Sequence, residues 1–401
     1  MQRRQFFKIS AGVAFSLSSL PMTAIAADKS DVRSNVLVLG GGMAGLCAAI
    51  SAKQSEASKV ILVEKGGFLG GHSILSGSGY WIGGTKIQKK AGIDDSLEIN
   101  WQDSLERGLK LNRFLKRDTG VARLVYEQGP KDLDWLESLG VKFTDQPAQA
   151  IGNRKRVHYF APGYRVGSPQ AIKALQAKAE SLGVEIVLNT KLVSLITESE
   201  KRNARVIGAI VENNKGNKYA IYADHGVILA TGGFGDNPAM IKEETGYEFG
   251  KTIFNFAIPG MKGDGLRMAW EAGAGKEPCT MELMYQLPDN MNHFILDGAF
   301  RQPCLWVNRN GQRFMPEDQI GNTTFTGNAI TAQPGSVAFS IFDSKLLKKY
   351  KKKGPDIVSH VHPHDLYDHF DEQWERDLAD GYEPITQADT LEELAQKAGI
   401  D

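Results

Sequence analysis

The stretch Gly40-Gly-Gly-Met-Ala-Gly45 stands between a short apolar run and a segment of small residues. We predict a buried parallel strand for Asn35–Leu39 before it and a helix for Leu46–Lys53 after it. A second apolar run, Val60–Val63, is predicted to be the next strand and ends at Glu64. This order of strand, turn, helix and strand predicts an α/β fold with a parallel sheet.

Three glycines of the turn have separate roles in a dinucleotide site. Gly40 allows the tight turn, Gly42 lets the backbone approach a pyrophosphate, and Gly45 allows the helix to pack closely on the strand. The helix N-terminus offers free N–H groups to the phosphates, and Glu64 can accept hydrogen bonds from ribose hydroxyls. A purely structural glycine turn is the alternative, but the matching strands and acid favour a dinucleotide site.

Composition excludes some classes of protein. The chain has 401 residues, with 47 Lys and Arg against 47 Asp and Glu, so its formal net charge is zero. This length suits two or three domains, and the balanced charge predicts no nucleic-acid partner. The 43 glycines suit loops that surround a cofactor.

The N-terminus has the features of an export signal. Arg3 and Arg4 lie in a basic start, an apolar stretch from Ile9 to Ile25 follows, and Ala24-Ile-Ala26 offers a cleavage site. The start resembles a twin-arginine signal, whose route exports folded, cofactor-loaded proteins. We expect residues 1–26 to be removed, leaving a periplasmic chain without a stable membrane span; a membrane anchor is the alternative.

The three cysteines and the clustered histidines do not indicate a metal site. Cys47 is predicted to be in the core, while Cys279 and Cys304 could pair in an oxidising compartment. No metal or haem spacing occurs among them. Pro363 and acidic neighbours favour a loop over a metal site for His360, His362, His364 and His369.

Periodicity outlines the rest of the chain. After residue 246 the strands become short and aromatic residues and prolines increase, which predicts a second domain over about 247–385. The basic run Lys345–Lys353 is predicted to be a solvated helix end. Before that boundary we predict helices within about 93–140 and over 171–182, strands over 184–188 and 191–197, a hairpin of 206–212 with 218–222, and a buried strand over 226–230.

Several motifs together resemble one known family over about residues 35–400. They are the turn Gly40–Gly45, Glu64-Lys65, Gly70-Gly-His-Ser73, Ala230-Thr-Gly-Gly233, Gly263-Asp-Gly265 and Val307-Asn-Arg-Asn-Gly-Gln-Arg-Phe314. The chain resembles the FAD-dependent flavoprotein subunit of the fumarate reductase and succinate dehydrogenase superfamily, in its soluble flavocytochrome c and urocanate reductase-like branch. The resemblance implies a Rossmann-like FAD-binding domain over 35–246 and an α+β capping domain over 247–385.

The resemblance also implies which residues hold FAD. His72 falls where membrane-bound members attach FAD covalently, and soluble relatives have asparagine there, so a covalent bond and a simple hydrogen bond both remain open. The full set implied by the resemblance is Gly40, Gly42, Met43, Ala44, Gly45, Glu64, Lys65, Gly70, Gly71, His72, Ser73, Gly77, Gly79, Leu192, Ala230, Thr231, Gly232 and Asp264.

The family's catalytic residues match this chain less completely than its FAD-binding residues do. Leu287 stands where fumarate reductases have an active-site histidine, and their arginine acid has no counterpart. Urocanate reductases use tyrosine and aspartate at the positions of Tyr285 and Asp297. With Arg301, these are the candidate catalytic residues; alternatively, Arg301 pairs with Asp297 or Glu317 and Tyr285 simply packs.

The family's FAD domain returns after the cap, and residues 386–401 correspond only to the start of that return. We therefore expect the C-terminal part of the FAD domain to be absent from these residues, with exposed apolar surface, weak flavin retention and little activity.

The resemblance implies an oxidoreductase that reduces an activated C=C bond of a small unsaturated acid, with hydride from flavin N5. No haem motif is present, so an external cytochrome or other redox protein must donate electrons. Two alternatives remain: a 3-ketosteroid dehydrogenase-like flavoenzyme, weakly supported by the loop Ser76–Trp81, and a degenerate, inactive flavin-binding fragment.

Overall fold

The computed structural model describes most of the chain beyond the N-terminal segment. The described residues are 32–112, 119–149, 154–201, 203–250, 253, 259–277, 285, 287–288, 292–357 and 367–400. The predicted export signal, Cys279 and the histidines at 360, 362 and 364 lie outside them.

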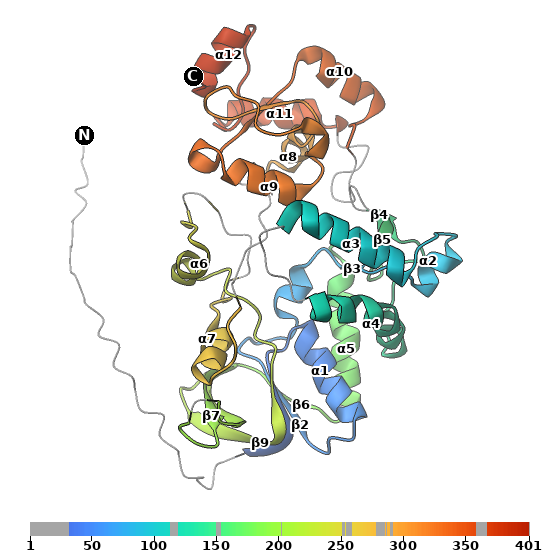
Figure 1. The fold of residues 1–401 in the computed structure, drawn as a ribbon, viewed down its shortest axis with the longest axis vertical. Coiled ribbons are helices and arrows are strands. Elements are labelled where there is room, and N and C mark those ends of the chain that lie inside the picture. Colours follow the sequence, from blue (N-terminus) through green and yellow to red (C-terminus); the bar gives the residue numbers. More distant parts are fainter. Residues whose placement is uncertain are drawn as a thin grey trace, which may run out of the picture.

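A six-stranded sheet forms the base of the molecule (Figure 1). Its strand order is β6-β2-β1-β9-β8-β7, parallel from β6 to β9 and antiparallel from β9 to β7. The α/β class with a parallel sheet is therefore confirmed. The strands are β1 (Val32–Leu39), β2 (Val60–Val63), β6 (Glu185–Val187), β7 (Thr190–Thr197), β8 (Val206–Asn213) and β9 (Lys218–Leu229).

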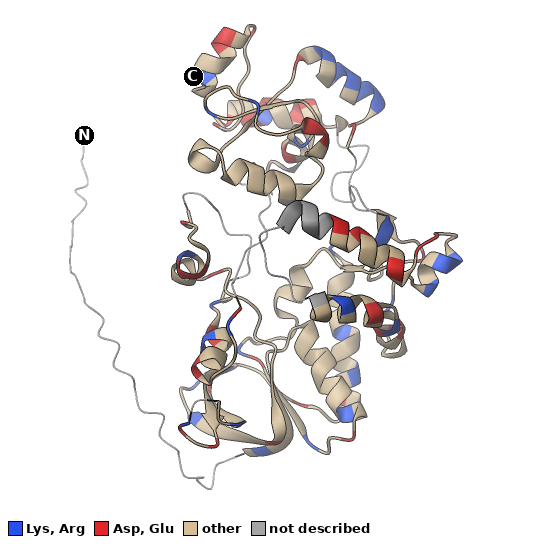
Figure 2. Cartoon of the chain, viewed as in Figure 1, with Lys and Arg blue, Asp and Glu red and all other residues tan. Residues whose placement is uncertain are grey.

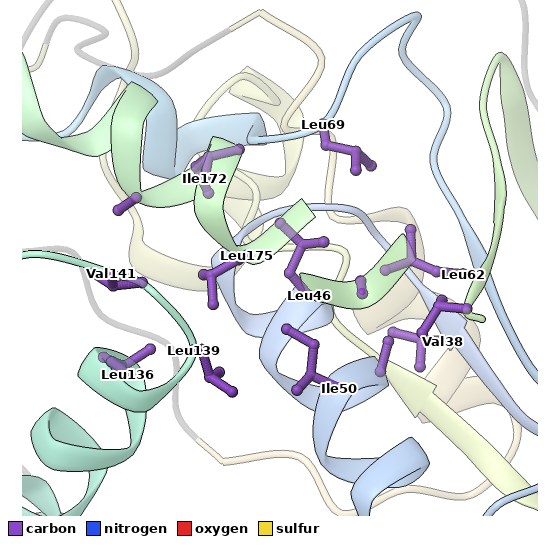
Figure 3. Packing of buried hydrophobic residues seen from close by; sticks show 14 of the residues in the cluster. Val38, Leu46, Ile50, Leu62, Leu69, Leu136, Leu139, Val141, Ile172 and Leu175 are labelled. Carbon is purple, nitrogen blue, oxygen red and sulfur yellow. The ribbon is translucent and has the colours of Figure 1, made fainter. Parts of the chain in front are cut away.

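Alternation along β1 and β2 divides the core into two layers, because successive strand residues point to opposite faces. Val38 and Leu62 face helices α1 (Met43–Gln54), α4 (Thr119–Ser138) and α5 (Gly167–Ser181). Figure 3 shows this layer closed by Leu46, Ile50 and Leu175, all fully buried. Leu37, Leu39, Ile61 and Val63 face the other way, toward Ala209, Val211, Ile221 and Ala223 of the antiparallel strands.

The hairpin strand and the later buried strand predicted from the sequence are one strand, β9. Its first part, from Lys218 to Tyr222, pairs with β8. Residues Ile221 to Leu229 pair with β1, with an irregularity in the register opposite Asn35. The prediction of two separate strands was wrong, because the chain continues as one strand past the polar Asp224 and His225, which lie at this irregularity. After Tyr222, the side of β9 that faces away from β1 pairs with no strand among the described residues. Ile228 and Leu229, in this part of β9, are exposed.

A three-stranded sheet, in the order β3-β5-β4, lies beside the base. A buried polar network supports it: the Arg156 guanidinium donates to both carboxylate oxygens of Asp95 at 2.6 and 2.8 Å. The fully buried His158 contacts the Thr85 hydroxyl through Nε2 at 2.8 Å. The elements are β3 (Gly79–Trp81), β4 (Ala148–Gln149) and β5 (Lys155–Tyr159), flanked by α2 (Lys86–Lys90) and α3 (Leu97–Asn112).

The described residues from 285 onward form an upper lobe with two apolar clusters (Figure 1). One surrounds Tyr350 and Phe370, and the other surrounds Trp306 and Ile320. Its elements are α8 (Phe294–Phe300), β10 (Leu305–Val307), η2 (Glu317–Gln319), α9 (Thr323–Thr331), η3 (Pro334–Ser336), β11 (Phe339–Ile341), α10 (Ser344–Lys353), α11 (Phe370–Ala379) and α12 (Leu391–Ala398). Helices α6 (Pro238–Thr245) and α7 (Asp264–Glu271) precede this lobe, and α7 packs on β7.

Several smaller predictions can be compared with the described residues. The lysines of α10 are exposed, as predicted, and colour much of this helix blue in Figure 2. Cys47 is partly buried against the first core layer, and Cys304 is a free, buried thiol 2.9 Å from the Ser340 hydroxyl. Among described residues, no group of His, Cys, Asp and Glu is placed to hold a metal, and no helix could cross a membrane.

Candidate functional site

Three predicted cofactor segments converge at the carboxyl ends of β1, β2 and β9. The Gly40 N–H donates to Val63 O at 2.8 Å, and the Ala230 N–H donates to Leu39 O at 2.8 Å. These bonds place the glycine turn between Glu64 on one side and Ala230 on the other. Ligands of open parallel sheets bind at this edge.

The glycines of the turn differ in the space around them. A Cβ on Gly45 would lie 1.8 Å from Gly40 O, and one on Gly40 would lie 2.3 Å from Ala230 O, so both positions exclude a side chain. A Cβ on Gly42 would meet only Gly70 O and Ser73 Oγ, both at 3.7 Å. Gly42 is the N-cap of α1 and makes no side-chain cap. The helix N-terminus is therefore open to an anion at the place where the sequence predicted a pyrophosphate.

Glu64 holds the loops around the turn with its two carboxylate oxygens. Oε2 accepts from the Gly41 N–H at 2.8 Å, and Oε1 accepts from the Gly66 N–H at 2.7 Å. Each carboxylate oxygen can accept more than one hydrogen bond. Glu64 can therefore organise the loop and still accept ribose hydroxyls.

The Gly70–Ser73 segment is hydrogen-bonded to the glycine turn and to the start of α1. Gly70 forms an isolated β-bridge with Gly42, and the Gly70 N–H donates to Gly41 O at 2.9 Å. The Ser73 hydroxyl accepts from the Met43 N–H, in the first turn of α1, at 3.2 Å. His72 lies in the same short helix, η1 (Gly71–Leu75), and is exposed. The histidine is thus beside the helix N-terminus and accessible to a ligand.

The Thr231 segment is held from the other side by α7. The Gly263 N–H donates to Gly233 O at 3.1 Å, and a Cβ on Gly265 would lie 2.0 Å from Thr231 Oγ1. Gly265 must therefore be glycine for α7 to reach Thr231. Asp264, the first residue of α7, is exposed beside this contact.

The remaining predicted cofactor residues lie around the same edge. Lys65 donates to Gly260 O, and the Thr190 N–H, two residues before Leu192, donates to Glu64 O at 3.0 Å. Met43, Ala44 and Gly232 belong to the segments already described. Gly77 is exposed on the loop that follows η1, and Gly79 is exposed at the start of β3.

The three catalytic candidates lie together in the upper lobe. Arg301 Nε donates to Asp297 Oδ2 at 2.8 Å, and the guanidinium lies 4.7 Å from the centre of the Tyr285 ring. Asp297 also accepts from the Leu287 N–H at 2.7 Å, and the Tyr285 hydroxyl donates to Ile320 O at 2.8 Å. Glu317 pairs with Arg313, so Asp297 is the carboxylate partner of Arg301.

The three catalytic candidates differ in how far their side chains are exposed to solvent. The side chain of Asp297 is 2% exposed and that of Arg301 is 16% exposed. Burial raises the pKa of the Tyr285 phenol, which therefore stays protonated at neutral pH. Arg301 is the member of this cluster with the most access to solvent or substrate.

Comparison with known proteins decides the cofactor. The family model described as an FAD-binding domain matches residues 35–380. The chain belongs to this FAD-binding family. Its cofactor is therefore FAD, and the cradle around Gly42 fits it, because the open helix N-terminus and the Glu64 carboxylate suit a pyrophosphate and a ribose.

Members of the FAD-binding family that resemble this chain include reductases. A probable fumarate reductase, Ifc3, from Shewanella frigidimarina is 31% identical over 94% of this chain and 58% of its own length. The open conformation of a flavocytochrome c3 fumarate reductase is 29% identical, with a TM-score of 0.60, over 92% of this chain and 59% of that one. This chain thus spans under two thirds of both proteins.

A steroid enzyme has a similar fold. The 3-ketosteroid-Δ4-(5α)-dehydrogenase of Rhodococcus jostii RHA1 is 23% identical, with a TM-score of 0.65, over 89% of this chain and 79% of its own. At this identity the likeness shows the fold alone.

Sequence reasoning missed several contacts near this FAD site. Gly41 was not singled out, although its N–H binds Glu64. Tyr159 was also missed, and it faces Gly79 across β3 and β5. The period of two along the strands, which puts Gly79 with Trp81 and Val157 with Tyr159 on one side, was the available signal.

Proposed function

We propose that this chain forms the FAD-binding and capping parts of a reductase that saturates a C=C bond next to a carboxylate. The observation that carries the proposal is the meeting of three groups at Gly42: the open N-terminus of α1, the Glu64 carboxylate and the Gly70–Ser73 turn. The reductases among its relatives support the choice of reaction.

When bound, FAD supplies a hydride from N5 to one carbon of the double bond. The protein must then deliver a proton to the other carbon, from a group within reach of the substrate. Arg301 is the proposed donor, because it is the most accessible of the three candidates. Asp297 fixes the guanidinium, and Tyr285 supports it with its ring.

The proposal includes an exported protein fed by another redox protein. The twin-arginine-like start supports export to the periplasm with FAD already bound. The sequence has no haem-attachment motif, so electrons are proposed to come from an external cytochrome or similar donor.

Anaerobic reoxidation of the photoreduced flavin tests this function. We expect fumarate, acrylate or urocanate to reoxidise it faster than buffer, and Arg301→Gln to slow that step while the flavin spectrum is retained. Reoxidation by a steroid enone alone would support the dehydrogenase alternative. Failure of every acceptor, with FAD stoichiometrically bound, would support the degenerate flavin-binding alternative.

A further inference from the structure

A buried carboxylate joins helices α8 and α11, which pack against each other in the upper lobe (Figure 1). The side chain of Asp377 on α11 is 1% exposed, and His293 Nδ1, at the start of α8, donates to its Oδ2 at 2.7 Å. Gln373 donates Nε2 to both carboxylate oxygens at 2.7 Å, and Arg376 adds two bonds of 3.2 Å to Oδ1. A buried charge needs such donors, so the imidazole is held from a well-fixed point on α11.

Tyr382 packs flat against the same imidazole. The centroids of the two rings are 3.6 Å apart, and their planes differ by 13°. The Tyr382 N–H donates to Asp377 O at 2.8 Å, which anchors this ring just after α11. The Tyr382 hydroxyl in turn donates to Pro288 O, and the Arg376 guanidinium donates to Asn292 O at 2.9 Å. The chain before α8 is therefore held at three places, Pro288, Asn292 and His293.

The residues held in this way are hydrogen-bonded to one of the catalytic candidates. Leu287, next to Pro288, donates its N–H to Asp297 Oδ1 at 2.7 Å, while Asp297 Oδ2 accepts from Arg301 Nε at 2.8 Å. The Asp297 N–H also donates to His293 O at 2.9 Å. Because a carboxylate is planar, a backbone donor that fixes Oδ1 also fixes the direction in which Oδ2 holds the guanidinium.

We propose that His293, Asp377 and Tyr382 are positioning residues for Arg301. They act through the Leu287 N–H and the start of α8, and none of them is proposed to touch the substrate. The inference rests on the proposed reductase function, in which Arg301 delivers the proton, and it adds what keeps the guanidinium in place. A misplacement of about 1 Å can cost about a hundredfold in rate, so the support of the proton donor bears directly on the reaction.

Two substitutions of His293 separate its hydrogen bond from its ring. His293→Asn keeps an N–H donor near the position of Nδ1 but removes the stack, whereas His293→Phe keeps a ring and removes the donor. The second change leaves the buried Asp377 carboxylate short of a donor, so it should loosen the cluster more. Tyr382→Phe keeps the stack and removes only the bond to Pro288 O, and it decides the question if His293→Phe does not fold. His369→Phe, at a histidine that is 69% exposed beside α11, is the control.

Anaerobic reoxidation of the photoreduced flavin by fumarate measures the effect on the reaction. We expect His293→Phe to lower the rate at saturating fumarate by about tenfold or more, with the fumarate concentration for half-maximal rate unchanged. His293→Asn should keep most of the parent rate, Tyr382→Phe should lose less than His293→Phe, and His369→Phe should match the parent. A residue that only stabilises the fold would leave the rate per bound flavin unchanged while the protein is folded.

Modification of Arg301 by phenylglyoxal, followed by mass spectrometry, needs no turnover. This reagent attacks guanidinium groups, and the bond to Asp297 should slow its reaction with Arg301. We expect His293→Phe to speed that reaction severalfold and to leave the modification of Arg267, which lies on α7, unchanged.

An Arg301 modification rate that stays the same in both His293→Phe and Tyr382→Phe would overturn the proposal. So would an unchanged rate of reoxidation in these variants when fumarate reoxidises the parent flavin, or equal losses in His293→Asn and His293→Phe. A parent flavin that no unsaturated acid reoxidises would count against the reductase function, while faster modification of Arg301 would still support the positioning role.

Discussion

The Glu64 carboxylate accepts a hydrogen bond from the backbone N–H of Gly41 at 2.8 Å, across the mouth of the glycine turn. The acid that follows β2, which the sequence predicted to accept ribose hydroxyls, therefore also holds the backbone of the turn. Because the same carboxylate also binds the Gly66 N–H at 2.7 Å, it links two loops at the FAD site.

Glu64→Gln should weaken both the loop and FAD binding. The amide NH2 of glutamine would face a backbone N–H, so one of the two donors would lose its acceptor at a cost of about 1–3 kcal/mol. Flavin fluorescence titration and thermal unfolding would measure the two effects. Glu200→Gln, on an exposed loop, is the matched control. An unchanged FAD affinity would show that Glu64 has no part in the site.

Gly42→Ala should impair FAD binding, whereas Gly45→Ala should impair the stability of the fold. The first adds a Cβ at ordinary contact distance, so the protein should fold normally but lose FAD affinity by about tenfold or more, since the methyl meets the pyrophosphate. The second places a Cβ 1.8 Å from Gly40 O and should destabilise the fold by about 3 kcal/mol or more.

Urea unfolding and FAD titration of both glycine variants would separate these effects. Gly226→Ala, where no atom lies within 4 Å of the added Cβ, should change neither quantity. Tight FAD binding by Gly42→Ala would contradict the assignment of the helix N-terminus to the pyrophosphate.

Stability should fall in mild acid through His158. Burial lowers its pKa, against smaller opposing effects of backbone hydrogen bonds to Tyr80 and Arg156. The unfolded chain then binds a proton more readily than the native one, so stability is full above the unfolded pKa, about 6.5, and is lost as pH falls below it. The free energy of unfolding at about pH 7.5 and about pH 5.5 should differ less in His158→Gln than in the parent. The exposed His369→Gln should behave like the parent.

Asp297 and Arg301 should be strongly coupled. Removing Arg301 alone leaves a buried carboxylate without its charged partner, which typically costs about 3–5 kcal/mol. The double variant Asp297→Asn, Arg301→Gln should lose less than the sum of the two single variants in urea unfolding. Strict additivity would contradict the ion pair as a buried unit.

Much of the first unit was predictable because its signals are local. The order of apolar run, glycine turn and small-residue helix from Asn35 to Glu64 depends on side-chain periodicity and on positions where a Cβ would clash, both of which sequence records directly. The continuous strand β9 was not predictable in this way. Its polar residues 224–225 are read locally as a break, whereas pairing with β1 carries the strand through them.

The sequence by itself determined the dinucleotide turn, the acid after the second strand and the family to which they belong. Only the tertiary structure decided that Glu64 binds Gly41 and that Arg301 pairs with Asp297 rather than Glu317. The physical reason is range: turn and strand preferences act between neighbours in the chain, while hydrogen-bond partners and cavity walls come from segments brought together by packing.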